Sequence, residues 1–279
     1  MKLGDIINLK EYPIHQRDNS DYQKIVEHTK LELADDGCAR LSNFILPQSL
    51  ARMKEEIDKN THGISWVKSE HNPYFNKKDD TLDESHPKNT FNLRSTGYLS
   101  SELVEDTSDY RFLFEDDHML QFVSDCFDVK PLYRYADPLA KHPYSIMNDG
   151  DYFPWHFDGN EYTISVLVKE ATSGGVFEYA PHIRSKGNEN FDGIREVLSG
   201  NKKMVKQLKL REGDLQFFKG RYSIHRVTKV QGESRYIAVP SYSPQPNRIN
   251  KPEHNRQVYG KHITLEGNQY NSTGDGLND

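Results

Sequence analysis

His156 and Asp158 are the residues of this sequence whose types and spacing most directly suggest chemistry. They lie two positions apart in the run YFPWHFDGN, residues 152–160, whose aromatic character is typical of β-structure. Because alternate side chains of a strand share a face, we expect the imidazole and the carboxylate side by side. Two histidines and one carboxylate on one side of a metal are the ligand set of non-haem Fe(II) oxygenases. The pair therefore predicts an iron site that needs a second histidine from another strand.

His225 is the candidate for that second histidine. It lies in the run GRYSIHRV, residues 220–227, late in a series of short strands. A jelly roll would bring this strand across from the one that carries His156. His156, Asp158 and His225 would then close a facial triad around a single Fe(II) ion.

Arg235 follows His225 by ten residues, on the next expected strand. A guanidinium directed into an apolar barrel requires an anionic partner, because its desolvation is costly. A carboxylate that accepts two parallel hydrogen bonds is the best match. 2-Oxoglutarate would supply it, with the distal carboxylate on Arg235 and the 2-oxo acid end on the iron. Arg235 therefore predicts 2-oxoglutarate as a cosubstrate.

Two further polar residues are candidates for binding roles. Arg94, in the run NTFNLRSTGY of residues 89–98, could clamp a substrate carboxylate, and a structural ion pair is an equal alternative. Asn148 directly precedes the strand that carries His156. It could contact 2-oxoglutarate, or it could simply form the turn of residues 148–150.

The elements that must position these residues are helices in the first half and short strands in the second. We expect helices at about 20–33, from Pro47, and at 112–127, with a short strand at 38–41. From Pro131 onward, short β-rich runs follow one another, separated by turn signals and by one helical insert at 191–198. This order predicts an all-β core with N-terminal helices, a double-stranded β-helix or jelly-roll (cupin-like) barrel. The expected strands are 132–135, 144–147, 152–157, 162–168, 176–179, 204–210, 215–218, 223–229 and 235–239.

The domain organisation follows from the same pattern. We expect residues 1–265 to form a single catalytic domain, with helical support at about 18–128 and the jelly-roll core at about 130–245. Residues 60–110 are polar and weakly patterned, which predicts a long loop that could act as an active-site lid. The polar tail, residues 266–279, is expected to be flexible.

Composition narrows the class of partner. The 279 residues carry a formal net charge of −6, which argues against nucleic acid as a partner. No apolar run has membrane-spanning length, and the first residues lack the features of a secretory signal. Cys38 and Cys126 are the two cysteines, outside any C-x-x-C spacing, which favours a reducing, cytoplasmic setting. We expect a small-molecule substrate, and the sequence leaves a homodimer open.

Beyond these single residues, the region from Trp155 to about Gly260 resembles the Fe(II)/2-oxoglutarate-dependent oxygenases. More narrowly, it is similar to the subgroup that contains the BesD-like free-amino-acid (lysine) halogenases and their hydroxylase relatives. The N-terminal half agrees loosely, through its helix-strand-helix opening and Arg94. The motifs that carry the resemblance are HFDGN at 156–160, GGVFEYAP at 174–181, NFD at 190–192, GDLQ at 213–216, GRYSIHRVT at 220–228, and the run from 235 to 242.

The resemblance implies a reaction. Halogenases of the subgroup have a small residue in place of the ligand carboxylate, which opens a position for chloride. Here that position is Asp158, so the resemblance implies hydroxylation. Fe(II), 2-oxoglutarate and O2 would hydroxylate an unactivated C–H of a small polar substrate, a free amino acid and lysine-like, with succinate and CO2 as products. Phe153 and Gly159, where polar contacts to lysine are expected, are apolar or bare, which counts against lysine itself.

Three other interpretations remain. A metal-dependent cupin isomerase or epimerase would use the same ligands but would need neither Arg235 nor 2-oxoglutarate. A protein side-chain hydroxylase, such as a prolyl hydroxylase, usually has lysine in place of Arg235 and needs a peptide-binding groove. A non-catalytic barrel would leave the metal ligands without purpose.

Overall fold

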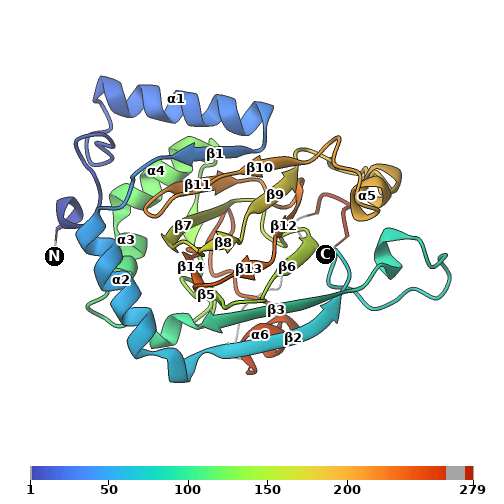
Figure 1. The fold of residues 1–279 in the computed structure, drawn as a ribbon. Helices are drawn as coiled ribbons and strands as arrows, with labels where there is room; N and C mark the ends of the chain where they lie inside the picture. The colour runs from blue at the N-terminus through green and yellow to red at the C-terminus, as the bar shows by residue number, and fades with distance from the viewer. Residues whose placement is uncertain (1, 262–273, 279) are drawn as a thin grey trace.

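Two facing β-sheets form the centre of the molecule in the computed structural model, which describes residues 2–261 and 274–278. Figure 1 shows the sheets enclosing an interior, with the first four helices on one side. The strand order is β1-β11-β7-β14-β5-β3-β2 in the larger sheet and β10-β9-β12-β6 in the smaller one. The expected jelly-roll core is therefore confirmed, as two sheets that do not join into a closed barrel. The larger sheet consists of β1 (Cys38–Leu41), β2 (Ser65–His71), β3 (Asn92–Leu99), β5 (Tyr144–Met147), β7 (Thr163–Lys169), β11 (Leu215–Phe218) and β14 (Arg235–Ala238), and the smaller of β6 (Phe153–His156), β9 (Phe177–Ala180), β10 (Lys206–Leu208) and β12 (Ile224–Val227).

Four helices cover the outer face of the larger sheet: α1 (Ser20–Asp35), α2 (Pro47–Lys59), α3 (Asp109–Glu115) and α4 (Asp117–Phe127). In α2, Pro47 starts the helix, and Leu50, Met53 and Ile57 lie on one buried face. Strand β7 alternates: Ile164, Val166 and Val168 join the core under the helices, whereas Thr163 and Ser165 line a cavity on the inner side. The helices thus rigidify the sheet from outside and leave its inner face available for a site.

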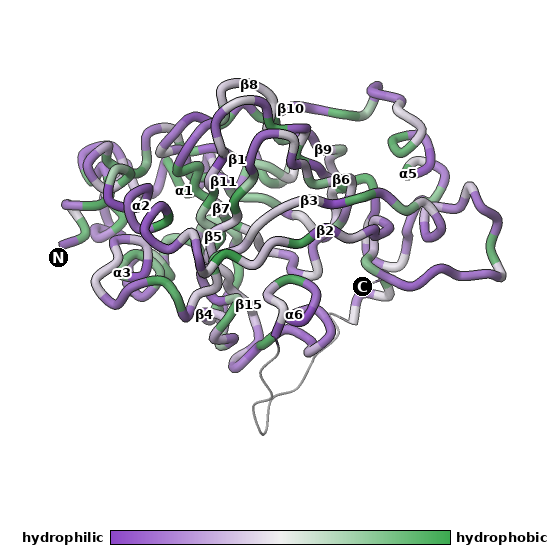
Figure 2. Tube along the Cα trace, turned by 60° about the horizontal axis from the view of Figure 1, so that its bottom comes forward, coloured by the Kyte–Doolittle hydropathy of each residue, from purple (hydrophilic) through white to green (hydrophobic). Residues whose placement is uncertain are grey.

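The first half of the chain differs from the sequence prediction in two places. The single helix expected at 112–127 is broken at Asp116, whose carboxylate accepts from His118 N and Met119 N and caps α4. Residues 60–110 are not one long loop, because β2 pairs along its full length with β3 and extends the larger sheet. Strand β2 is the sheet edge and exposes four of its seven side chains, so its sequence is polar. Figure 2 shows most of the remaining excursion, residues 72–91, as a hydrophilic segment that projects beyond the sheets, whereas Tyr74 near its start is buried against Trp155 and Phe157.

The second half agrees closely with the predicted strands. It also contains α5 (Phe191–Leu198), at the position of the expected helical insert, and α6 (Pro252–Tyr259), which the sequence did not indicate. Two short strand pairs, β8 (Ser173–Gly174) with β13 (Val230–Gln231) and β4 (Tyr133–Arg134) with β15 (Tyr242–Ser243), complete the architecture. None of the described helices combines the length and apolar character that crossing a bilayer requires.

Residues 274–278 belong to the tail that was expected to be flexible, but they pack against the core. Asp275 accepts from Nε and Nη2 of Arg221 at 2.5 and 2.7 Å, and the Arg221 side chain is only 1% exposed. Asn278 donates its backbone N–H to Glu189, and its carbonyl accepts from Arg184. Residues 266–273 and 279 of the predicted tail lie outside the described residues.

Candidate metal centre

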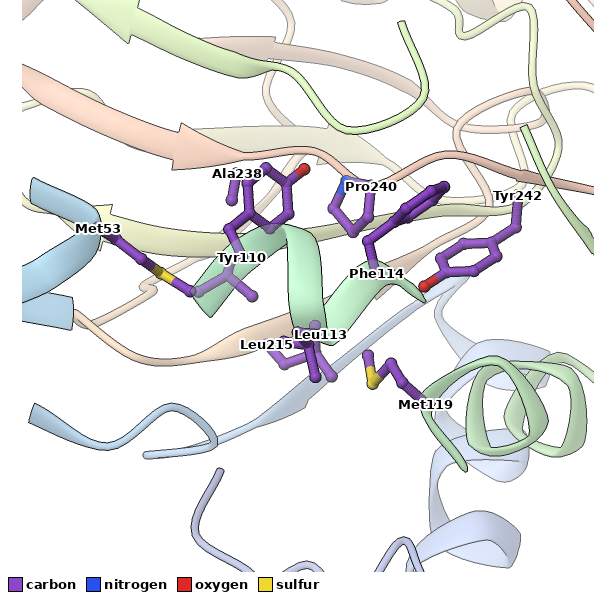
Figure 3. A pocket seen from close by; sticks show the side chains of 10 residues that line it. Met53, Tyr110, Leu113, Phe114, Met119, Leu215, Ala238, Pro240 and Tyr242 are labelled. Carbon is purple, nitrogen blue, oxygen red and sulfur yellow. The ribbon is translucent and has the colours of Figure 1, made fainter. Parts of the chain in front are cut away.

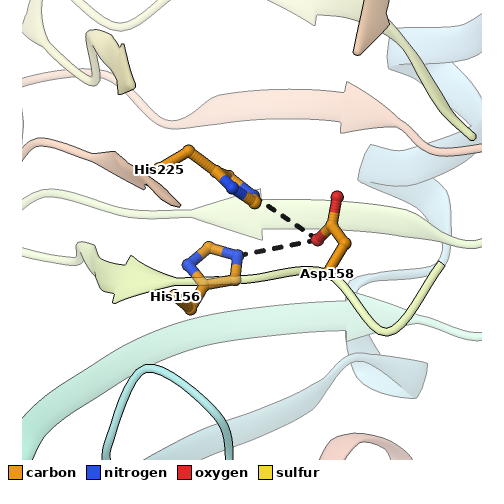
Figure 4. Close-up of side chains that lie close together, drawn as sticks. All are labelled: His156, Asp158 and His225. Carbon is orange, nitrogen blue, oxygen red and sulfur yellow. Dashed lines mark ion pairs between the residues drawn. The ribbon is translucent and has the colours of Figure 1, made fainter. Parts of the chain in front are cut away.

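The two candidate histidines lie directly opposite each other in the smaller sheet. Strands β6 and β12 are antiparallel, and their register pairs His156 with His225. The ring centroids are 4.1 Å apart, and both residues are buried. Figure 4 shows the two imidazoles and the Asp158 carboxylate turned toward one another.

Backbone carbonyls orient both rings. Nδ1 of His156 lies 2.8 Å from the carbonyl oxygen of Pro154, and Nδ1 of His225 lies 3.0 Å from that of Ser223. A hydrogen on each Nδ1 donates to these oxygens and leaves the Nε2 lone pair for a metal. Burial, followed by the neighbouring His225, holds the pKa of His156 well below its usual value. The neutral form that a metal ligand requires is therefore favoured.

Asp158 brings the third donor. Its Oδ1 lies 3.9 Å from Nε2 of His156 and 3.4 Å from Nε2 of His225, and one donor atom from each residue lies within 4.8 Å of the others. Burial raises the pKa of Asp158, but the adjacent imidazoles outweigh burial and lower it to about 2. Ligand bonds to a first-row metal are about 2.0–2.2 Å long. One divalent ion can therefore reach all three donors with small side-chain adjustments, and the set suits Fe(II).

Two neighbours fix the position of the Asp158 carboxylate. Thr163 Oγ1 donates to Oδ2 at 2.8 Å, and the backbone N–H of Asp158 donates to the carbonyl of Gly220 at 3.1 Å. A Cβ atom on Gly220 would lie 1.9 Å from Asp158 Oδ2, so this glycine is required for space and not for an unusual φ. The hydrogen bonds with Thr163 and Gly220 both hold the carboxylate toward the histidines.

Arg235 projects from β14 into the same interior. It is 4% exposed and lines the cavity next to the triad. Burial alone lowers its pKa to about 10, and no described residue supplies a carboxylate to it. Gly175 makes room for its stem, because a Cβ there would lie 2.9 Å from Arg235 Cδ. In the described part of the chain, Arg235 is thus a buried cation without an anionic partner, as a carboxylate-binding group would be before its ligand binds.

Arg94 lies on β3 and lines the cavity from the other side. It is 3% exposed, and its Nε lacks a hydrogen-bond partner among the described residues. Its guanidinium carbon lies 5.3 Å from the Phe153 ring centre and 5.8 Å from that of Phe75. Of the two alternatives for Arg94, the ion pair is therefore not observed within the described part of the chain, and a binding role stays a prediction.

Asn148 does not join these residues. It is exposed in the turn between β5 and β6, and its side-chain oxygen accepts from Ser234 Oγ at 2.7 Å. Its backbone N–H donates to Asp151. Asn148 is also absent from the described lining of the cavity. These contacts support the turn role and not the contact to a cosubstrate.

A cavity of about 490 Å³ connects the triad, Arg235 and Arg94 and continues to α6. This volume lies within the range of small-molecule sites. A second cavity, shown in Figure 3, has about 10 Å³ and an apolar lining that includes Met53 and Leu113. It lies between the helices and the outer face of the larger sheet and has room for about one water molecule. The large cavity is therefore the candidate active site.

Several residues of this site were not predicted from the sequence. Phe153 stacks on His156 with ring centres 3.9 Å apart, and Thr163 and Gly220 hold Asp158 as described above. Glu253, His254 and Gln257 of α6 also line the cavity. Pro252 was a usable start signal for α6, but the sequence that follows it is too polar to suggest a cavity wall.

Comparisons with known proteins give a family and similar folds. The family model described as Halogenase D matches residues 21–258, whereas a search of curated proteins finds no significant match. A 2OG-Fe(II) oxygenase family oxidoreductase from Burkholderia pseudomallei is similar in structure, with a TM-score of 0.54 at 13% identity over 79% of this chain and 91% of that one. AviO1 from Streptomyces viridochromogenes is similar with a TM-score of 0.54 at 17% identity, over 81% of this chain and 97% of that one. HygX from Streptomyces hygroscopicus, solved with nickel and 2-oxoglutarate bound, is similar with a TM-score of 0.53 at 14% identity, over 84% of this chain and 96% of that one.

Proposed function

The chain belongs to the Halogenase D family, and from this premise we propose that it is an Fe(II)- and 2-oxoglutarate-dependent dioxygenase that hydroxylates an unactivated C–H bond. The family match confirms the resemblance expected from the motifs between residues 156 and 242. In this proposal His156, Asp158 and His225 hold the iron, and Arg235 holds the distal carboxylate of 2-oxoglutarate. Bound iron and cosubstrate would supply the oxidation, in which O2, 2-oxoglutarate and R–H give succinate, CO2 and R–OH.

The presence of a carboxylate at position 158 is the observation that favours hydroxylation over halogenation. Halide transfer in the related halogenases needs the coordination position that a small residue leaves open. Here a carboxylate points at both imidazoles, with Oδ1 at 3.4 and 3.9 Å, and Thr163 holds it there. A third protein ligand supports hydroxyl transfer, although the family is named for halogenation.

Arg94 supports a substrate with a carboxylate. Its guanidinium is buried next to the Phe75 and Phe153 rings, its Nε has no hydrogen-bond partner among the described residues, and it lines the cavity that contains the triad. A free amino acid is a small polar substrate of this kind, and its carboxylate would bind Arg94 through charge-assisted hydrogen bonds. The resemblance implies, more narrowly, a lysine-like side chain. Whether such a side chain fits depends on the charges that line the cavity.

Arg235 also bears on the rival functions. A cupin isomerase or epimerase without a keto-diacid would leave this buried guanidinium without an anion, at a high cost in desolvation. A prolyl-hydroxylase-type enzyme usually has lysine at this position. We also infer a reducing, cytoplasmic setting, because Cys38 and Cys126 are buried free thiols.

The test is anaerobic reconstitution with Fe(II) and 2-oxoglutarate, followed by O2 and a panel of free amino acids. We expect succinate, and a product about 16 mass units heavier than the substrate, with no chlorinated product in chloride buffer. The His225→Ala variant, which lacks one ligand, is the control and should bind little iron. A chlorinated product from the unaltered protein would refute the role given to Asp158. Absence of 2-oxoglutarate binding would refute the whole proposal.

A further inference from the structure

Apart from the metal centre and Arg235, the lining of the cavity carries an excess of positive charge. Arg94, Arg248 and Lys251 line it, and the carboxylates among its described lining residues are Asp158 and Glu253. Asp158 belongs to the metal triad. Among the described lining residues, three cationic side chains therefore face a single carboxylate that is available to a substrate. Asp137, buried behind the wall where it accepts from Asn250 N and Asn255 Nδ2, offsets one of the two excess charges and leaves a net positive charge.

The other charged groups at the cavity balance one another. Arg184 lines it too, but Glu189 accepts from its Nη1 at 3.0 Å and neutralises it. At the metal centre, the two positive charges of Fe(II) and the one of Arg235 would offset the three negative charges of Asp158 and of the two carboxylates of 2-oxoglutarate. The excess that remains therefore acts on the substrate.

The three cations differ in their surroundings. Arg94 is buried and its Nε lacks a partner among the described residues, so one anionic group of the substrate satisfies it. Arg248 is half-buried and Lys251 is exposed, just before α6. A second anionic group, at the other end of the substrate, would meet these two residues at the cavity wall formed by the chain around α6.

We infer that the substrate is a small molecule with two anionic groups, of which the acidic amino acids are the simplest examples. The inference rests on the proposed function and replaces its lysine-like form. The second ammonium group of lysine would enter a region of positive potential, where Glu253, an exposed residue, is the one described carboxylate on offer. An acidic side chain meets opposite charge at both ends.

The experiment compares L-aspartate, L-glutamate and L-2-aminoadipate with L-lysine, L-ornithine and L-leucine in the reconstituted enzyme. The measurements are substrate-stimulated succinate formation and the product 16 mass units heavier. We expect kcat/KM for the best acidic probe to exceed that for lysine by about tenfold or more. Arg248→Glu should shift this preference toward lysine, whereas Lys203→Gln, a change at an exposed lysine outside the cavity lining, should leave it unchanged.

Each outcome decides the inference. Preference for lysine, ornithine or leucine would overturn it while leaving the dioxygenase intact. So would an enzyme that binds Fe(II) and 2-oxoglutarate but responds to no acidic probe, or an Arg248→Glu variant with unchanged preference. Failure to bind Fe(II) and 2-oxoglutarate would instead overturn the proposed function from which the inference starts.

Discussion

Replacement of Gly220 by alanine tests the metal centre without touching a ligand. The new Cβ would lie 1.9 Å from Asp158 Oδ2, 2.6 Å from its Cγ and 3.0 Å from its Cβ, and real Cβ contacts essentially never fall below 3.0 Å. The carboxylate must therefore move by more than an ångström. Gly220 does not have a positive φ, so alanine itself causes no backbone strain there.

The size of the effect follows from what the displaced carboxylate loses. Asp158 would lose the hydrogen bond from Thr163, 2.8 Å long, and its aim at the two imidazoles. Changes to residues that merely support a ligand typically lower metal affinity about 10- to 100-fold. Because this change displaces a ligand itself, we expect Gly220→Ala to weaken Fe(II) binding roughly 100-fold or more.

The assay is an anaerobic Fe(II) titration, with urea unfolding of the metal-free protein measured alongside. The matched control is Gly159→Ala, next to Asp158 on the other side, where an added Cβ meets no heavy atom within 4 Å. The control should bind Fe(II) like the unaltered protein. If Gly220→Ala also does so while remaining folded, the carboxylate is not held where the structure places it, and the reasoning fails.

Three further predictions concern the same region. Arg235→Gln should raise the KM for 2-oxoglutarate about 10- to 100-fold, by loss of a charge-assisted pair, and leave Fe(II) affinity unchanged in the titration; an unchanged KM would remove Arg235 from the cosubstrate site. Thr163→Val should lower Fe(II) affinity about tenfold, and Thr163→Ser should restore it; equal affinities in both variants would show that the hydroxyl is dispensable. Asp275→Asn should lower the free energy of unfolding in urea by about 2 kcal/mol, because two charge-assisted hydrogen bonds from the buried Arg221 guanidinium lose their carboxylate acceptor, and a loss below about 0.5 kcal/mol would mean that this pair contributes little to stability.

The sequence was sufficient for the residues whose chemistry depends on alternation along a strand. His156, His225 and Arg235 lie on strands that were predicted correctly, and period-2 geometry directs their side chains to one interior. The meeting of His156 with His225 required one further assumption, the jelly-roll order of strands, which the register of β6 and β12 bears out.

The sequence was insufficient where burial and sequence polarity disagree. Strand β2 is an edge strand with a solvated face, so its polar sequence resembled a loop. Helix α6 has few apolar residues because most of its side chains face solvent or the cavity, where Glu253, His254 and Gln257 lie. The requirement for glycine at Gly220 is a matter of distance to Asp158, 62 residues earlier in the chain, and no local pattern encodes it.

The ion pair between Arg221 and Asp275 also links residues 274–278 to the metal centre. The two residues are 54 positions apart, and Arg221 directly follows Gly220, whose carbonyl accepts from the backbone N–H of Asp158. The segment expected to be a free tail thus contributes, through Arg221 and Gly220, to the position of a metal ligand.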